Sequence, residues 1–495
     1  MHLAHDRSAC VSSKPNILLI TDDQHRFDFF GHTGLAGSLQ TPAMDRLAKQ
    51  GTVLSQTFSN CPVCMPTRFS WYHGLYASQA AYGLVRNNHD WPMLPSMPQA
   101  LQQNGYHTAV IGKVHAHGGL NFIDLRDEQD KLLARGFDQA IEVCGKSLAS
   151  WRDCHWTQHL QKRGLLNAYR RDITRRNPQL GGKERYEPSC LNAEDYIDGF
   201  IGNQALDWLN VYDCDKPFFL HVSFCAPHFP LDPPMPYFGR HQPDDMPRPI
   251  GVDDPQRIRQ FQEHRAKHAD MITLVDDQIA RLLDWLDQHG LASNTVVIFG
   301  SDHGDMIGDL GLDHKGWAYD PSCRTPIIIR WPGHVPAGEQ RDGMVEAVDL
   351  PCTLLEMAGC NGPIDRWLPQ TPGRSFLPYI TGQKSDHRDW AYAECELQGR
   401  DLAQDAPMDS QSWRMCCERD WKYVLHAHDR EQFFDRQADP HEQHNLAADP
   451  THAQRISRMR RQLIQSMSFC VAPNTMPQAP RRPIRETAKT GHEDD

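Results

Sequence analysis

Short apolar runs alternate with helical patterns along most of the chain. The runs occupy residues 15–21, 108–112, 217–223, 295–300 and 326–330. Continuous apolar runs of this length are typical of strands that are buried on both faces of a parallel sheet. Helical spacing of apolar residues lies between them, at residues 41–50, 96–104, 195–211 and 257–289. Strands that alternate with helices predict an α/β fold with right-handed crossovers and a doubly wound sheet.

The pattern changes after about residue 382, where the apolar segments become shorter. Residues 390–396, 413–417 and 421–426 are typical of short strands, and residues 450–468 of a helix. We therefore expect a large α/β domain over residues 1–385 and a small C-terminal α+β subdomain over residues 386–471. The remaining residues, 472–495, are rich in Pro, Arg and Glu, which favours a loosely ordered tail.

A basic segment interrupts the α/β pattern at about residues 120–187 and looks like an insertion. It carries Arg170, Arg171, Arg175 and Arg176 in a chain whose net charge is −12. A solvated helical face is the simpler interpretation, because runs of charge usually face water. The alternative is that these arginines line one wall of a substrate cleft and attract an anionic ligand.

Polar residues follow four of the apolar runs. In sheets of this kind, ligands bind beyond the carboxyl ends of the strands. The side chains that follow the runs therefore predict one shared site. They are Asp22 and Asp23, then Lys113, His115 and His117, then His228, and finally Asp302 and His303.

The charge and the cysteine content narrow the class of protein. A net charge of −12 over 495 residues argues against binding to nucleic acid or to a membrane surface, because both are anionic. No apolar run reaches transmembrane length, and residues 1–15 contain none that is typical of a signal peptide. The 15 cysteines are odd in number and scattered, a pattern typical of reduced thiols. We therefore expect a cytoplasmic protein.

Residues 61–70, Cys-Pro-Val-Cys-Met-Pro-Thr-Arg-Phe-Ser, form the most informative segment. The pair Cys61 and Cys64 has the spacing of a redox or zinc motif, but the sequence has no second pair of this kind to complete a zinc site. Cys64, Pro66 and Arg68 together resemble the signature of the type I sulfatases, in the alkaline phosphatase superfamily. In that family a separate maturation enzyme oxidises the cysteine to formylglycine. Thr67 is a mild departure, because the family usually has Ser there.

The resemblance extends along nearly the whole chain in the expected order. It implies an alkaline-phosphatase-like fold, with a central, mostly parallel sheet flanked by helices, and the activity of a sulfuric-ester hydrolase such as an arylsulfatase. The segments that carry it are residues 14–23, 41–48, 112–115, 226–228, 301–304, 314–316 and 434–446.

The resemblance also implies roles for individual residues. Asp22, Asp23, Asp302 and His303, together with residue 64, would bind one divalent metal. Carboxylate ligands favour Ca²⁺ or Mg²⁺, and the histidine makes Mn²⁺ admissible; we expect Ca²⁺. The other implied catalytic residues are Arg68, Lys113, His115, His228 and Lys315, and Asn87 resembles a sulfate-contacting position.

The implied chemistry begins with hydrated formylglycine at position 64. Its metal-activated hydroxyl would attack sulfur and expel the alcohol, which leaves a covalent sulfate hemiacetal. His115 would then deprotonate the second hydroxyl, so that the hemiacetal collapses to the aldehyde and releases sulfate. The partners would be a small-molecule or carbohydrate sulfate ester and a formylglycine-generating enzyme, and the polar tail could exchange between copies in a homo-oligomer. Two alternatives stay open: a phosphonate monoester hydrolase or phosphodiesterase of the same superfamily, and a binding protein that keeps the fold without being matured.

Overall fold

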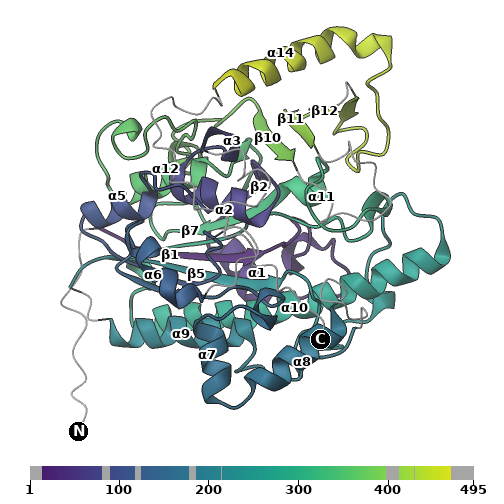
Figure 1. The fold of residues 1–495 in the computed structure, drawn as a ribbon. Coiled ribbons are helices and arrows are strands. Elements are labelled where there is room, and N and C mark those ends of the chain that lie inside the picture. Colours follow the sequence, from purple (N-terminus) through teal and green to yellow (C-terminus); the bar gives the residue numbers. More distant parts are fainter. Residues whose placement is uncertain are drawn as a thin grey trace, which may run out of the picture.

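The computed structural model describes residues 14–80, 90–117, 124–177, 186–212, 215–396, 412–427 and 430–469. Within these ranges, nine strands form a sheet in the order β4-β3-β5-β1-β6-β7-β2-β8, with β9 paired to β2 (Figure 1). Every pair is parallel except those of β7, which runs antiparallel to β6 and β2. Helices flank this sheet, so the prediction of a mostly parallel α/β fold is confirmed.

The apolar runs of the sequence form the strands at the centre of the sheet. They are β1 (Asn16–Asp23), β3 (His107–Gly112), β5 (Phe218–Pro227), β6 (Thr295–Ser301) and β7 (Arg324–Arg330). We expected β7 to be parallel, and its direction differs because no long helix crosses the sheet before it. The connection from β6 contains only the short helices η8 (Asp309–Gly311) and α11 (Asp320–Cys323), whereas a parallel crossover usually contains a full α-helix that packs on the sheet.

Four strands lie outside the apolar runs. They are β2 (Thr52–Phe58), β4 (Gln139–Glu142), β8 (Glu339–Arg341) and β9 (Val345–Glu346). β2 mixes polar with apolar residues, and β4, β8 and β9 are short, so apolar patterning alone does not indicate them.

Helices cover both faces of the sheet, which is therefore the middle of three layers. One face carries α1 (Pro42–Gln50), α9 (Ile197–Val211) and α10 (Pro255–Gln288). The other carries α2 (Cys64–His73), α5 (Met97–Gln103) and α12 (Asp349–Met357). The side chains of β1 point to the two faces alternately: Leu18 packs with the first group of helices, and Ile17 and Leu19 pack with the second.

The basic segment contributes to both faces: Leu132 packs with the second group of helices, and the two longest helices of the segment pack with the first. It contains α6 (Gln129–Leu133), β4, α7 (His155–Lys162) and α8 (Leu166–Arg176). Apolar residues of α7 and α8 belong to the same buried cluster as those of α9 and α10. The remaining short helices are η2 (Gly31–Thr33), α3 (Ala77–Ala80), η3 (Leu125–Glu128), η4 (Leu148–Ser150), η6 (Pro243–Asp245), η7 (Ala292–Asn294), η9 (Ile364–Arg366), α13 (Leu377–Ile380) and η12 (Pro450–His452).

The C-terminal part forms a second sheet of four antiparallel strands, β10 to β13, with α14 above it (Figure 1). The elements are β10 (Ala391–Glu396), β11 (Ser412–Cys417), β12 (Trp421–His426), β13 (Glu431–Asp435) and α14 (Ala453–Phe469). One face of this sheet packs under α14, and the other joins the core beneath α2 and α12. Among the described residues, no helix is both long and apolar enough to cross a bilayer.

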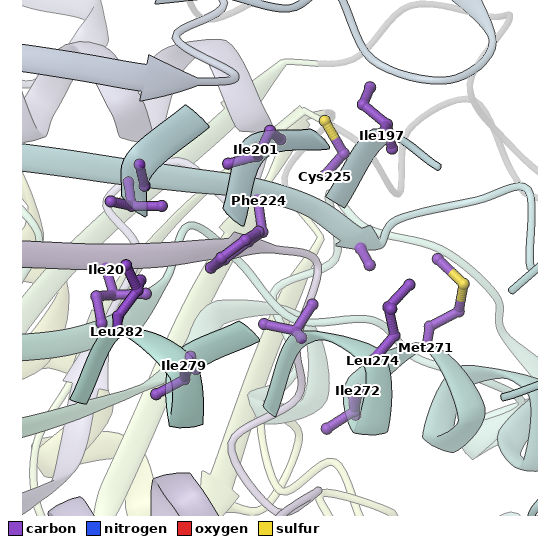
Figure 2. Packing of buried hydrophobic residues seen from close by; sticks show 14 of the residues in the cluster. Ile20, Ile197, Ile201, Phe224, Cys225, Met271, Ile272, Leu274, Ile279 and Leu282 are labelled. Atoms are coloured by element: carbon purple, nitrogen blue, oxygen red, sulfur yellow. The ribbon is translucent and has the colours of Figure 1, made fainter. Parts of the chain in front are cut away.

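The centre of the larger core lies between β5 and the helices α9 and α10. Figure 2 shows Phe224 of β5 among Ile201 of α9 and Ile279 and Leu282 of α10. All of these side chains are fully buried. The sequence signal for this packing is the continuous apolar run of β5 together with the apolar stripes of the two helices.

Truncation of Phe224 tests this packing. Phe224→Ala should lower the free energy of unfolding by about 3–5 kcal/mol, because the ring leaves a cavity between rigid elements. Urea unfolding followed by circular dichroism measures the change. Leu35→Ala is the control, because Leu35 is 60% exposed, and its effect should stay within about 0.5 kcal/mol. Equal losses in the two variants would contradict the packing described here.

Candidate active site

The parallel strands end at one edge of the sheet, and most of the predicted residues meet there. Asp23 ends β1, Lys113 follows β3, His228 follows β5, and Asp302 and His303 follow β6. The chain reaches this edge again at the start of α2, whose first residue is Cys64.

Cys64 and Arg68 lie one helical turn apart on α2. Residues at this spacing project from the same side of a helix, which explains why the motif separates them by four positions. Pro66 is in the first turn, where its missing N–H leaves no hydrogen bond unmade. The hydroxyl of Thr67 donates to the carbonyl of Cys61 at 2.7 Å and lies 2.6 Å from the Ser59 hydroxyl, so it holds the preceding loop.

Four of the described side chains form a group that could bind a metal ion: Asp23, Cys64, Asp302 and His303, all buried, with ligand atoms within 4.8 Å of one another. Asp22 is not among these four, and its Oδ2 lies 2.6 Å from His25 Nδ1. Its Oδ1 is buried and has no hydrogen-bond partner among the described residues. Asp22 therefore stays a predicted ligand of the metal.

Arg68 joins the elements beneath this group. It is fully buried, and its guanidinium donates to Asp302 Oδ2 at 2.8 Å and to Asp23 Oδ2 at 3.0 Å. A third nitrogen donates to Ser223 Oγ at 2.7 Å and to the carbonyl of Lys113. One side chain of α2 is therefore hydrogen-bonded to residues of β1 and β5 and to the residues that follow β3 and β6.

Lys113 is placed by the glycine before it. Gly112 has a φ of +119° and lies so close to β5 that a Cβ atom there would come within 1.9 Å of the Ser223 carbonyl oxygen. Glycine alone fits this approach. The Lys113 amine then reaches Asp23 Oδ2 at 2.7 Å.

Lys315 and His228 lie on the more exposed side of Cys64. The Lys315 amine is 3.1 Å from Cys64 Sγ and 2.8 Å from His228 Nε2. His228 Nδ1 donates to the carbonyl of Phe229 at 2.7 Å, which leaves Nε2 directed at the lysine. Both residues are partly exposed, whereas Asp23, Asp302 and His303 are fully buried. A substrate would therefore meet the cations first.

His115 lies near Cys64, in the loop that follows β3. Burial lowers the pKa of its ring, and the neighbouring Cys64 side chain partly offsets this. Its backbone N–H donates to Glu142 Oε1 at 3.2 Å. Its φ of +62° is unusual for a residue with a side chain.

The electrostatics of the site favour an anionic residue 64. Burial alone would raise the pKa of the Cys64 thiol, but the charges of Lys113, Lys315 and His303 outweigh it and hold that pKa well below its ordinary value. The helix N-terminus favours negative charge in the same way. Burial and then the neighbouring Asp23 raise the pKa of Asp302 to about 6. Two buried carboxylates that repel each other in this way make a favourable place for a cation.

Two residues at this edge were not among the sequence predictions. Gln24 follows Asp23 with a φ of +73°, and its side chain accepts from the Lys315 amine at 3.2 Å and donates to Asp305. Glu142 ends β4, a strand that the apolar pattern did not predict. The sequence could have indicated Gln24 by its position directly after the first apolar run and the two aspartates. No sequence pattern indicates Glu142.

Asn87, the predicted sulfate contact, lies outside the described residues. Of the arginines proposed for a cleft wall, Arg176 is 1% exposed and is paired with Asp232 at 2.9 Å and with Asp172 at 2.7 Å. Arg170 pairs with Asp153, and Arg175 with Asp172 and Glu187. Arg176 is thus part of the interior and does not line a cleft, because the helix that bears it packs against the core.

Comparison with known proteins identifies the family. The sulfatase family model matches residues 15–360, and the model of the C-terminal region of N-sulphoglucosamine sulphohydrolase matches residues 308–468. The chain belongs to the sulfatase family. This sulfatase is accordingly a sulfuric-ester hydrolase with an alkaline-phosphatase-like fold, as the resemblance implied.

Individual relatives cover almost the whole sulfatase. It is 29% identical over 489 residues to an arylsulfatase of Clostridium perfringens. The alignment covers 92% of this chain and 94% of the relative. It is also 29% identical to the multifunctional alkaline phosphatase superfamily protein PehA of Trinickia caryophylli, over 89% of this chain and 93% of the relative. Its fold is similar to that of a phosphonate monoester hydrolase from Silicibacter pomeroyi, with a TM-score of 0.76, 25% identity and coverage of 92% and 95%.

The helix that carries Cys64 should make the sulfatase sensitive to acid. His73, the last residue of α2, is buried, and burial lowers its pKa from 6.5 to about 3. Its contribution to stability is therefore present above pH 6.5 and is lost as the pH falls toward 3, by up to about 1.4 kcal/mol per pH unit. The urea midpoint should fall less steeply between pH 7 and pH 5 in His73→Gln than in the wild type. Parallel slopes would show that His73 takes up a proton equally in both states.

Proposed function

We propose that this sulfatase hydrolyses a sulfate monoester with formylglycine, derived from Cys64, as its nucleophile. One observation carries the proposal: residue 64 lies at a helix N-terminus, beside the buried Asp23 carboxylate and within reach of the charges of Lys113 and Lys315. This environment stabilises negative charge on residue 64 and on a bound sulfate. The family match and the arylsulfatase relative support the same activity.

The donor atoms of the site fit one divalent metal ion. Asp22, Asp23, Asp302 and His303 would hold it together with an oxygen of the modified residue 64. Three carboxylates and one imidazole suit Ca²⁺, our first choice, and also Mg²⁺ or Mn²⁺. The raised pKa of Asp302 supports this assignment, because a cation would relieve its repulsion by Asp23. When bound, such an ion polarises a sulfate oxygen and lowers the pKa of a hydroxyl at residue 64.

The remaining side chains divide the work of binding and proton transfer. Arg68 and Lys113 hold residue 64 and neutralise its charge, since both are hydrogen-bonded to Asp23 beside it. His228 and Lys315, which lie 2.8 Å apart and are partly exposed, contact the sulfate and protonate the leaving alkoxide. His115, whose ring interacts with residue 64, is the base that removes its remaining hydroxyl proton. Asn87 is a further candidate contact.

The partners follow from this chemistry. The substrate is a small-molecule or carbohydrate sulfate ester, and a formylglycine-generating enzyme must act on Cys64 before the sulfatase is active. The scattered, odd set of 15 cysteines favours the cytoplasm as the compartment.

A phosphonate monoester is the second candidate substrate. The fold similarity to a phosphonate monoester hydrolase supports it, as does the Asp23-Gln24 pair at the site. A sulfate monoester and a phosphonate monoester each present one negative charge on a tetrahedral centre, so the metal site binds both kinds of group.

Mass spectrometry and kinetics on protein co-produced with a formylglycine-generating enzyme test the function. We expect an aldehyde or its hydrate at position 64 and a higher kcat/KM for an aryl sulfate than for an aryl phosphonate monoester. Cys64→Ala should lose at least about 10³-fold of the rate, because the nucleophile is removed.

The matched control is Cys61→Ala, in the same buried loop, which should keep the modification and the activity. A higher kcat/KM for the phosphonate would move the assignment to the second candidate. Turnover by a chain with an unmodified thiol at position 64 would contradict the nucleophile.

Metal removal gives a second test, with a readout other than activity. Chelation should lower the melting temperature, and excess Ca²⁺ should restore it; at 100 times Kd an ion stabilises the fold by about 2.7 kcal/mol. Asp302→Asn should lose most of this shift. Asp22→Asn should also reduce it, because the buried Oδ1 of Asp22 has no hydrogen-bond partner among the described residues and is a predicted ligand atom. A full shift in Asp22→Asn would show that Asp22 is not a ligand.

A further inference from the structure

His115 has a backbone conformation that raises the free energy of any residue with a side chain. Its φ is +62°, in the left-handed region, and it lies three residues beyond the end of β3. Such outliers persist only when the surroundings hold them, and they concentrate at functional sites. The contacts of the His115 backbone are therefore as important as those of its ring.

The contact that holds this backbone comes from Glu142. Glu142 is the last residue of β4 and is paired in register with Gly112 of β3. Its Oε1 accepts the N–H of His115 at 3.2 Å. The two strand ends thus bring a carboxylate directly beneath the loop that bears His115.

The Glu142 carboxylate is buried and is not stabilised by solvent. It is 3% exposed, and the nearest ring nitrogen of His117, itself 2% exposed, lies 3.6 Å from Oε2. Lys113, His115, His117 and Glu142 together line a small cavity of about 10 Å³. A carboxylate placed here loses its hydration, and among the described residues its side chain gains one hydrogen bond, from His115.

We propose that Glu142 is a positioning residue for His115, which it holds in the left-handed conformation through the backbone N–H. This assignment rests on the proposed function, in which His115 is the base. The hydrogen bond sets the direction in which the imidazole leaves the chain and so keeps the ring against residue 64. Glu142 itself touches neither substrate nor nucleophile. What matters is an acceptor oxygen at the length of a glutamate side chain, not its charge.

A pair of conservative variants separates length from charge. Glu142→Gln keeps an acceptor oxygen in place, and Glu142→Asp keeps the charge but withdraws the oxygen by one methylene. With an aryl sulfate, Glu142→Gln should retain kcat within about threefold, while Glu142→Asp should lose on the order of tenfold with KM unchanged, the effect of one hydrogen bond. The opposite order, or wild-type kcat in Glu142→Asp, would overturn the proposal.

Hydrogen–deuterium exchange provides a readout that does not depend on activity. The amide of His115 should exchange faster in Glu142→Asp than in the wild type and Glu142→Gln. If the wild type hydrolyses no sulfate ester, the proposed function fails, yet this exchange still decides whether Glu142 holds the loop. Equal protection in all three proteins would refute the positioning role.

Asp138→Ala is the matched control. Asp138 also accepts a backbone N–H across the same pair of strands, that of Thr108 at 2.9 Å, but at the opposite edge of the sheet. It should change the melting temperature without changing kcat or the exchange at His115. A tenfold loss of kcat in this variant would show that any weakening of the β3–β4 pair acts on the site, and would overturn the specific role of Glu142.

Discussion

The active site depends on the burial of Arg68 between two carboxylates. Asp23 and Asp302 end adjacent strands of the sheet and have no access to water, so neither would stay ionised without a cation beside it. The planar guanidinium binds both, and its third nitrogen reaches Ser223 on β5. Because Arg68 is fixed by these strands, the helix that carries it is fixed too, and Cys64 one turn earlier is placed over the strand ends. The spacing of the motif is therefore a structural requirement as well as a chemical one.

The same charges explain how an acidic protein binds an anion. The net charge is −12, yet Lys113, Lys315 and Arg68 surround residue 64. The carboxylates of Asp23 and Asp302 neutralise much of this positive charge at a distance. Inside the site, where water screens charges little, the cations still attract an anion that lies close to them. The partly exposed Lys315 and His228 lie above the buried ligands. This order places the groups that bind the ester at the entrance and those that bind the metal at the base.

The sequence predicted the strands at the centre of the sheet and the site residues that follow them, but not the edge strand β4 or the direction of β7. Strands such as β1 and β5 are buried on both faces and leave an unbroken apolar run, and polar residues after such runs must meet at one edge. The pattern gave no sign of β4, which is too short for a periodic signal. The direction of β7 and the interior pairing of Arg176 depend on contacts with distant segments, which local pattern does not contain.

The C-terminal sheet takes part in the same construction, although the sequence suggests a separate subdomain. The indole of Trp413 on β11 donates to the carbonyl of Gly316 at 2.8 Å, and the N–H of Gly316 donates to the carbonyl of Pro62 at 3.1 Å. The residue after Lys315 is thus held between the C-terminal sheet and the loop that leads into Cys64. Lys422 of β12, fully buried, pairs with Asp320 in the segment that follows. Since the core beneath α2 and α12 also includes residues of β10 and β11, the position of the Lys315 amine depends on both parts of the chain. The second family match, over residues 308–468, spans both sides of this contact, as expected if the Lys315 loop and the C-terminal sheet form one structural unit.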